Sequence, residues 1–199
     1  MTRTPTPAPV PALGARLGAY IDEVRSWCRG GPVTEARLAT LRAAAARLVS
    51  APLELAPGQR VVPTTGYGRN LLHHDAEHGF VVLAMVWPAG IGGNPHDHGT
   101  WGVVAVAEGE VEVVDYAAQP LDSQGERVAL TPLARVVGGP GATAFVLPPD
   151  HDLHSVANAS ATRPALSIHT YGRHIDRCRV MDRETGAVTW VTPQYHSVP

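Results

Sequence analysis

A single segment, from Gly90 to Gly109, constrains this chain more than any other. It reads GIGGNPHDHGTWGVVAVAEG and holds His96 and His98, with Gly90 six residues before the first histidine. Side chains alternate across a β-strand, so two histidines with one residue between them point to the same face. We therefore expect this pair to lie on a strand that Gly109 closes at a turn, and to reach one metal ion together.

A third histidine, His154, follows in the segment PDHDLHSVAN. These spacings together resemble the two-motif signature of the cupins. A cupin usually places a glutamate four or five residues after the second histidine, and here those positions are Gly102 and Val103. His96, His98 and His154 would then form a site of three neutral imidazoles, which suit iron, zinc, copper or nickel about equally. Because no protein carboxylate would bind the metal, a coordination position would stay open and the metal's positive charge would not be neutralised, which suits an anionic substrate. The alternative is that all three are ordinary surface or core histidines.

Composition narrows the class of protein. The chain has 199 residues, 44% hydrophobic and 17% charged, a balance that predicts one globular domain with its own core. A net charge of −2 with no basic run argues against nucleic acid as a partner. All sixteen positive charges are arginine, which excludes a lysine Schiff base. Two cysteines favour a reducing cytoplasm, and no apolar stretch reaches the length of a membrane span. We expect a monomer.

The order of patterns along the chain predicts helices first and strands afterwards. Residues 1–12 form a proline-rich tail that we expect to be disordered. Apolar residues at helical spacing predict a helix over 13–29, and Thr34 is a suitable N-cap for a second helix that Pro52 ends. From about residue 60 the pattern changes to strands separated by turns. We expect a single domain over 13–199, with a helical cap over about 13–50 and an antiparallel β-barrel over about 60–199.

The strands differ in how clearly the sequence marks them. The apolar run 80–86 predicts a strand buried on both faces or a barrel wall. Segments 101–107 and 111–116 predict a hairpin around residues 108–110, and 121–125 predicts a turn. Further short strands are expected at residues 144–147, 166–171, 179–181 and 188–191.

Two polar sets lie outside the histidine motifs. Ser167, His169 and Tyr171 alternate along one strand, so they share a face and are candidates for a hydrogen-bond relay. The alternative is an exposed polar strand face. Tyr67 and Arg69 share a face if the chain is extended before the first barrel strand, and an arginine at a barrel mouth can hold a carboxylate through two hydrogen bonds. The alternative is a solvated loop arginine.

Other titratable residues are assigned no site. His73, His74 and His78 flank the turn DAEHG and are expected at the surface. Cys28, on the first predicted helix, is expected in the protein core. Nothing adjacent to Cys178 activates its thiol.

Taken together, these residues resemble the cysteine dioxygenase family of thiol dioxygenases. The matching positions are Tyr67-Gly-Arg69-Asn70, Trp87, Pro95-His96-Asp-His98, Gly109, His154-Ser, Ser167-x-His169-x-Tyr171, Ile175-Asp-x-Cys178 and Thr185-Gly186. The resemblance implies a cupin jelly-roll barrel that holds mononuclear non-haem Fe(II) on the three histidines. It also implies that Arg69, Tyr67 and Trp87 bind the substrate, and that Ser167, His169 and Tyr171 form an outer catalytic triad.

One departure from the family concerns position 102. Mammalian cysteine dioxygenases carry there a cysteine cross-linked to the tyrosine that matches Tyr171, whereas this chain has glycine, as bacterial members do. No thioether can form. A second comparison concerns the substrate. Relatives that act on 3-mercaptopropionate tend to have glutamine where Arg69 stands, so the resemblance favours L-cysteine as the substrate of this chain.

The function that the sequence favours is oxidation of L-cysteine to cysteine sulfinic acid, with a small thiol and O2 as the only partners. One alternative is a dioxygenase for 3-mercaptopropionate or another small thiol. Another is a non-catalytic ligand-binding cupin, and a third is a zinc or nickel cupin that acts as an isomerase or hydrolase.

Overall fold

The computed structural model describes residues 14–199, so the tail expected over 1–12 lies outside the described residues. Helix α1 (Ala15–Cys28) is followed by α2 (Glu35–Leu48) and a short 3₁₀ helix (Pro57–Gln59). Thr34 caps α2 as predicted, because its side-chain oxygen accepts a hydrogen bond from the Arg37 N–H at 3.3 Å. No helix within residues 14–199 combines the length and the apolar character needed to cross a lipid bilayer.

After the helices the regular structure consists of strands, and every ladder between them is antiparallel. In the described residues they are β1 (Gly68–His74), β2 (Val81–Trp87), β3 (Gly102–Glu108), β4 (Val111–Pro120), β5 (Val128–Gly138), β6 (Thr143–Val146), β7 (His154–Asn158), β8 (Ala165–Tyr171), β9 (Cys178–Met181) and β10 (Val188–Val191).

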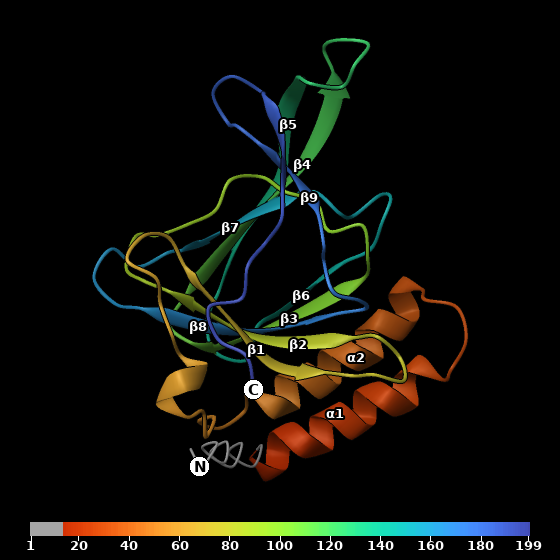
Figure 1. Cartoon of the computed structure of the whole chain (residues 1–199), viewed down its shortest axis with the longest axis vertical. Coiled ribbons are helices and arrows are strands. Elements are labelled where there is room, and N and C mark those ends of the chain that lie inside the picture. Colours follow the sequence, from red (N-terminus) through yellow and green to blue (C-terminus); the bar gives the residue numbers. More distant parts are fainter. Residues whose placement is uncertain (1–13) are drawn as a thin grey trace, which may run out of the picture.

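Two sheets face each other to form the barrel. The larger has the order β1-β2-β8-β3-β6, the smaller has the order β5-β4-β7, and β9 pairs with β10. The helices pack against the outer face of the larger sheet, while the β4–β5 hairpin projects on the opposite side of the molecule (Figure 1). The predicted mainly β, antiparallel jelly-roll barrel with N-terminal helices is confirmed.

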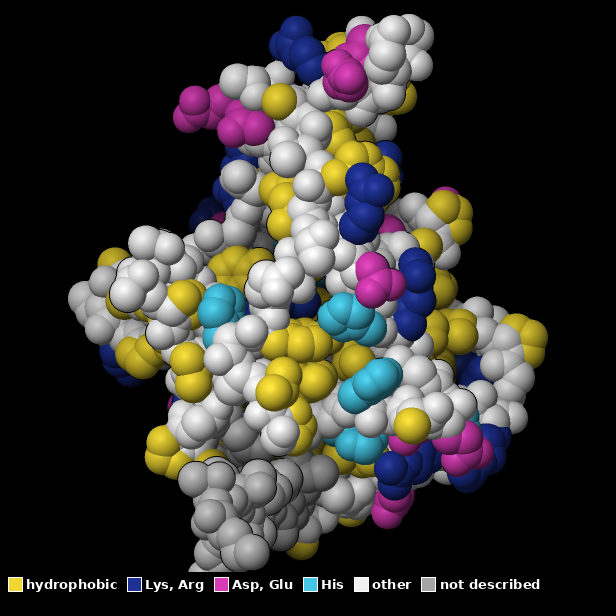
Figure 2. Space-filling model, viewed as in Figure 1, with side chains coloured by type: hydrophobic (Ala, Val, Ile, Leu, Met, Phe, Trp, Pro, Cys, Tyr) yellow, Lys and Arg dark blue, Asp and Glu magenta, His cyan; other side chains and the backbone are white. Residues whose placement is uncertain are grey.

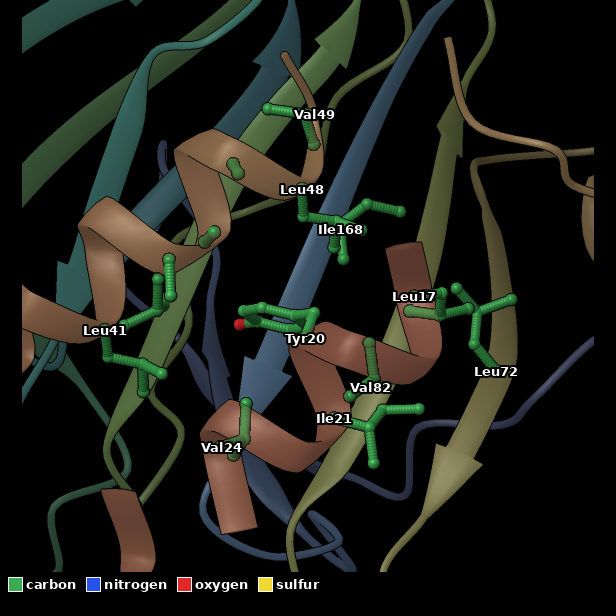
Figure 3. Packing of buried hydrophobic residues seen from close by; sticks show 14 of the residues in the cluster. Leu17, Tyr20, Ile21, Val24, Leu41, Leu48, Val49, Leu72, Val82 and Ile168 are labelled. Atoms are coloured by element: carbon green, nitrogen blue, oxygen red, sulfur yellow. The ribbon is translucent and has the colours of Figure 1, made fainter. Parts of the chain in front are cut away.

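The central strands of the larger sheet, β2 and β8, are buried on both faces, as the apolar run over 80–86 predicts for β2. Val82 and Ile168 point outward and pack against Leu17, Tyr20 and other residues of the two helices (Figure 3). The Tyr20 hydroxyl is hydrogen-bonded to Thr170 Oγ1 at 2.7 Å, which joins α1 to β8. Because strand side chains alternate, the opposite residues of β2 and β8 point into the barrel, and the candidate site lies there.

The hairpin predicted from segments 101–107 and 111–116 is wrong. β3 pairs with β6 and β8, whereas β4 pairs with β5 and β7, so the two consecutive strands belong to different sheets. Gly109, with φ of +70°, lies in the turn between them. Alternating apolar residues identify a strand, but they do not identify its partner.

Three strands were not predicted as such. β1 begins at Gly68, so Arg69 lies on a strand rather than in a loop before it. β7 begins at His154 itself. β5 is an edge strand with most residues exposed, so it has no alternation of apolar and polar residues to mark it, and it pairs with β4 across the turn at 121–125.

His73 and His78 are not surface residues, although the sequence predicts them there. Both are half-buried and hydrogen-bonded to Asp75, at 3.3 Å and 3.0 Å. Arg25 of α1 reaches the same carboxylate, with 2.7 Å between Nε and Oδ2. Burial alone would raise the pKa of Asp75, but hydrogen bonds from Arg25, His78 and His73 outweigh it and hold that pKa below its usual range. This cluster ties α1 to the β1–β2 turn.

Candidate metal centre

Three histidines from two distant segments converge inside the barrel. His96 lies on an extended segment that forms an isolated bridge to His154, with hydrogen bonds of 2.8 Å and 3.2 Å between their backbones. His96 forms a second isolated bridge to Val180, so isolated bridges replace the predicted strand, but the predicted common orientation is correct. The ring centroids of His96, His98 and His154 are 4.8–5.1 Å apart, and their candidate ligand atoms lie within 4.8 Å of one another.

Hydrogen bonds occupy Nδ1 of the His96 and His98 rings and leave Nε2 of each free. His96 Nδ1 donates to the Asn94 carbonyl at 2.9 Å, and His98 Nδ1 donates to Asp152 Oδ1 at 3.1 Å. The Nε2 atoms of His98 and His154 are buried and have no hydrogen-bond partner within residues 14–199. Buried nitrogens rarely lack a partner, so this arrangement fits a transition-metal ion held by neutral imidazoles.

Burial also keeps the rings in the form that binds metal. Removal from water, together with the neighbouring His98, lowers the pKa of His96 to about 3. The same causes hold the pKa of His154 well below its ordinary value. A protonated imidazole cannot coordinate a metal, so both rings are available as ligands at neutral pH.

The two aspartates next to the histidines have different surroundings. Asp97 turns away from the centre, as strand alternation predicts, and its carboxylate accepts from Arg179 Nε at 2.6 Å. Asp152 accepts from the backbone N–H groups of His98 and Gly99 at 3.0 Å, in addition to the His98 ring. The only sequence signal for this orienting contact is the place of Asp152 two residues before His154.

A chain of hydrogen bonds runs through β8 beside the histidines. Trp87 Nε1 donates to Ser167 Oγ at 2.8 Å, Ser167 Oγ lies 2.8 Å from His169 Nε2, and His169 Nδ1 lies 3.0 Å from the Tyr171 hydroxyl. These contacts follow from the shared strand face that the sequence predicts.

The direction of this chain follows from its first member. An indole N–H can only donate, so Ser167 accepts from Trp87. Ser167 is fully buried, and among residues 14–199 its hydroxyl forms hydrogen bonds only with Trp87 and His169. The polar hydrogens of Trp87, Ser167 and His169 all have acceptors if Ser167 donates to His169 Nε2 and His169 Nδ1 donates to the Tyr171 oxygen. The Tyr171 O–H is then free to donate into the barrel.

Beside the histidines lies a cavity of about 360 Å³, lined by Tyr67, Arg69, His96, His98 and Tyr171 among others. Arg69 Nε is buried there without a hydrogen-bond partner. Trp87 is not among the lining residues but stacks behind Tyr67, with 4.5 Å between ring centroids. Figure 2 shows other, exposed histidine side chains in cyan on the side of the molecule that it presents, whereas His98 and His154 are buried. The site thus combines three histidines that could hold a metal ion with an unpaired cation.

Residues 58–184 match the family model of cysteine dioxygenase type I. The chain belongs to the cysteine dioxygenase type I family. Cysteine dioxygenase type 1 of Homo sapiens is 28% identical over 138 residues, which covers 66% of this chain and 63% of the human protein. The Rattus norvegicus protein of the same name is 44% identical over 45 residues, or 23% of this chain and 22% of that protein. The match thus spans less than two thirds of the length of these relatives.

Among solved structures, an acetylacetone dioxygenase from Acinetobacter johnsonii has a TM-score of 0.42 and 16% identity, covering 71% of this chain and 85% of that one. A cupin from Ralstonia eutropha has a TM-score of 0.43 and 12% identity, covering 66% and 72%. Every site residue named above lies within the stretch that matches the cysteine dioxygenase family.

Gly102 shows how this cysteine dioxygenase family member accommodates an unmodified tyrosine. It lies opposite Tyr171 in the β3–β8 ladder, and a Cβ atom at position 102 would come 2.6 Å from the tyrosine ring. The ring thus occupies space that only glycine leaves open. Tyr171 stacks on His98, with ring centroids 5.3 Å apart, and burial raises the pKa of its phenol. Tyr171 is therefore a neutral hydrogen-bond donor beside a candidate ligand.

Proposed function

We propose that this protein is a thiol dioxygenase that converts L-cysteine and O2 to cysteine sulfinic acid in the cytoplasm. In this reaction both oxygen atoms add to the sulfur, the S–H bond breaks, and the thiol proton leaves to solvent. The product is the sulfinic level of sulfur oxidation. The proposal assigns His96, His98 and His154 as ligands of one Fe(II) ion.

The observation that carries the proposal is the unpaired Arg69 guanidinium in the cavity that His96 and His98 also line. Guanidinium groups bind carboxylates through paired, charge-assisted hydrogen bonds. A small amino acid whose carboxylate contacts Arg69 would place its other end toward the imidazoles. Tyr67 lines the same cavity and is stacked on Trp87, so we assign Tyr67 to direct contact with substrate and Trp87 to supporting it.

Ferrous iron on the three imidazoles would supply a centre at which a thiol ionises and dioxygen is activated. The ligand set contributes no negative charge, which favours a thiolate. Arg69 neutralises the substrate carboxylate, and the cavity walls hold the thiol in one orientation, which lowers the entropic part of the barrier.

The remaining roles concern the hydroxyl proton of Tyr171. Burial raises the pKa of Tyr171, and burial with the nearby Arg69 holds the pKa of His169 well below its usual value. The Tyr171 O–H therefore stays in place through the reaction, oriented by His169 and Ser167. We assign it the role of hydrogen-bond donor to oxygen atoms that approach the sulfur.

The test is oxygen uptake by protein purified without oxygen and analysed for metal. L-cysteine, 3-mercaptopropionate and cysteamine serve as substrates, and product mass reports the gain of two oxygen atoms. We expect iron to support activity and L-cysteine to be oxidised most efficiently. Loading with zinc or nickel should give no uptake. Absence of uptake with every thiol by the iron-loaded protein would overturn the proposal.

Arg69→Gln tests the role of the guanidinium. Loss of a charge-assisted pair should raise KM for L-cysteine about tenfold, on the roughly 1.5–3 kcal/mol of a hydrogen bond to a charged group. Cysteamine has no carboxylate, so its poor turnover should change little. Arg135→Gln, at an exposed arginine paired with Glu112 on the far hairpin, is the matched control. Equal turnover of cysteamine and L-cysteine by the parent protein would rule out this role for Arg69.

A further inference from the structure

The chain end beyond the family match runs along the substrate cavity. We call residues 192–197 the C-terminal strap. It follows β10 and reaches β1, where Arg69 N–H donates to His196 Nδ1 at 2.9 Å and His196 N–H donates to the Arg69 carbonyl at 2.7 Å. Leu71 N–H donates to the Ser197 carbonyl at 2.9 Å. In Figure 1 the dark blue chain end lies beside β1. The strap thus holds the Arg69 backbone from both its N–H and its carbonyl group.

The strap also forms one wall of the cavity. The strap residues that line the same space as Arg69, His96 and His98 are Thr192, Pro193, Gln194 and His196. Residues 58–184 match the family model, so this wall comes from a segment outside the match. The shape of the cavity at the Arg69 end is therefore set partly by residues that the family assignment does not describe.

Within the strap, Tyr195 contacts the arginine side chain. Its ring centroid lies 6.0 Å from Arg69 Cζ, at the limit of a cation–π contact. The ring is half-buried, and its hydroxyl is hydrogen-bonded to His174 Nδ1 at 2.5 Å. Within residues 14–199 no hydrogen bond or ion pair holds the Arg69 guanidinium, so Tyr195 is the aromatic contact that can fix its direction.

We propose that the C-terminal strap is a selectivity element for the substrate carboxylate, in which Tyr195 is a positioning residue that holds the Arg69 guanidinium toward the cavity. The substrates it favours are small thiols with a carboxylate at the end away from sulfur. This inference rests on the proposed thiol dioxygenase function. A flexible arginine that is already oriented loses less freedom when it binds its ligand, so the gain is in binding rather than in chemistry.

The test compares Tyr195→Leu with Trp190→Leu. Trp190 is an exposed aromatic residue of β10 that lies over Arg177, so its replacement removes a similar contact away from Arg69. We expect Tyr195→Leu to raise KM for L-cysteine by about three- to thirtyfold, the range of cation–π contacts, with kcat within about twofold and KM for cysteamine unchanged. Trp190→Leu should leave all three values at the parent level. Tyr195→Phe keeps the ring and should restore most of the selectivity.

Thermal unfolding of each variant is measured first, and Tyr195→Met replaces the leucine variant if that one unfolds. An unchanged ratio of KM values for L-cysteine and cysteamine in a folded variant would overturn the inference. An equal loss in Tyr195→Phe would do the same, because the ring would then have no role. If the parent oxidises no thiol, the proposed function fails, and anaerobic titration of metal-loaded parent and Tyr195→Leu with L-cysteine still decides the inference. Equal dissociation constants would refute it.

Discussion

Asp152 offers the sharpest test of how the barrel prepares its metal ligands. Its carboxylate accepts three hydrogen bonds of 3.0–3.1 Å, two from the His98 and Gly99 backbone and one from His98 Nδ1. The ring contact keeps hydrogen on Nδ1 and directs Nε2 toward the other two imidazoles. Replacement by alanine removes the carboxylate but keeps the Asp152 backbone carbonyl, which lies 3.2 Å from the same Nδ1, so the His98 ring should lose part of its orientation.

The size of the effect follows from these contacts. Only the bond to the ring acts on the ligand itself, and partners of this kind typically contribute 10- to 100-fold in metal affinity. At 25 °C that is about 1.4–2.8 kcal/mol, which agrees with the roughly 1.5–3 kcal/mol of one hydrogen bond to a charged group. We therefore expect Asp152→Ala to weaken metal binding by about tenfold, the lower end of this range, because the backbone carbonyl at position 152 still contacts the His98 ring. The other two histidines should keep their positions.

Competition with a chelator of known affinity, under anaerobic conditions, measures the change. Asp97→Ala is the matched control, because Asp97 adjoins the same histidine in sequence but points to Arg179. Its metal affinity should stay within about threefold of the parent, since it makes no contact with a candidate ligand ring. Parent-like affinity in Asp152→Ala, or an equal loss in Asp97→Ala, would refute the assignment of Asp152 as the residue that orients His98.

Two further predictions concern Tyr171 and Asp75. Tyr171→Phe should keep metal and cysteine binding but slow turnover by up to roughly 10²-fold, or uncouple oxygen use from sulfinate formation. An unchanged rate would contradict this prediction. So would an intact mass of the parent protein that is lower by two hydrogens, the sign of a thioether. The lowered pKa of folded Asp75 means that its contribution to stability is complete above the unfolded value of about 4 and is lost as pH falls further. Denaturation of Asp75→Asn should therefore show lower stability at pH 6 and a shallower decline below pH 4 than the parent; parallel curves would contradict this.

The periodicity of strand side chains allowed much of the site to be predicted from sequence. Residues two apart share a face whatever the strand pairs with, so the pairing of His96 with His98 and the alignment of Ser167, His169 and Tyr171 needed no tertiary information. The continuous apolar run of β2 likewise indicated a strand buried on both faces. Thr34 marked the start of α2 because its capping contact involves only the next turn of chain.

The contacts that depend on two distant segments were decided by the tertiary structure alone. Apolar alternation does not choose a strand's partner, so β3 and β4 were wrongly paired, and the exposed edge strand β5 carried no signal. The same reason hid the contact of Asp152 with His98, the position of Trp87 behind Tyr67, and the strap beside Arg69. Local patterns determine which way a side chain faces, whereas the partner it meets there depends on how the two sheets close around the core.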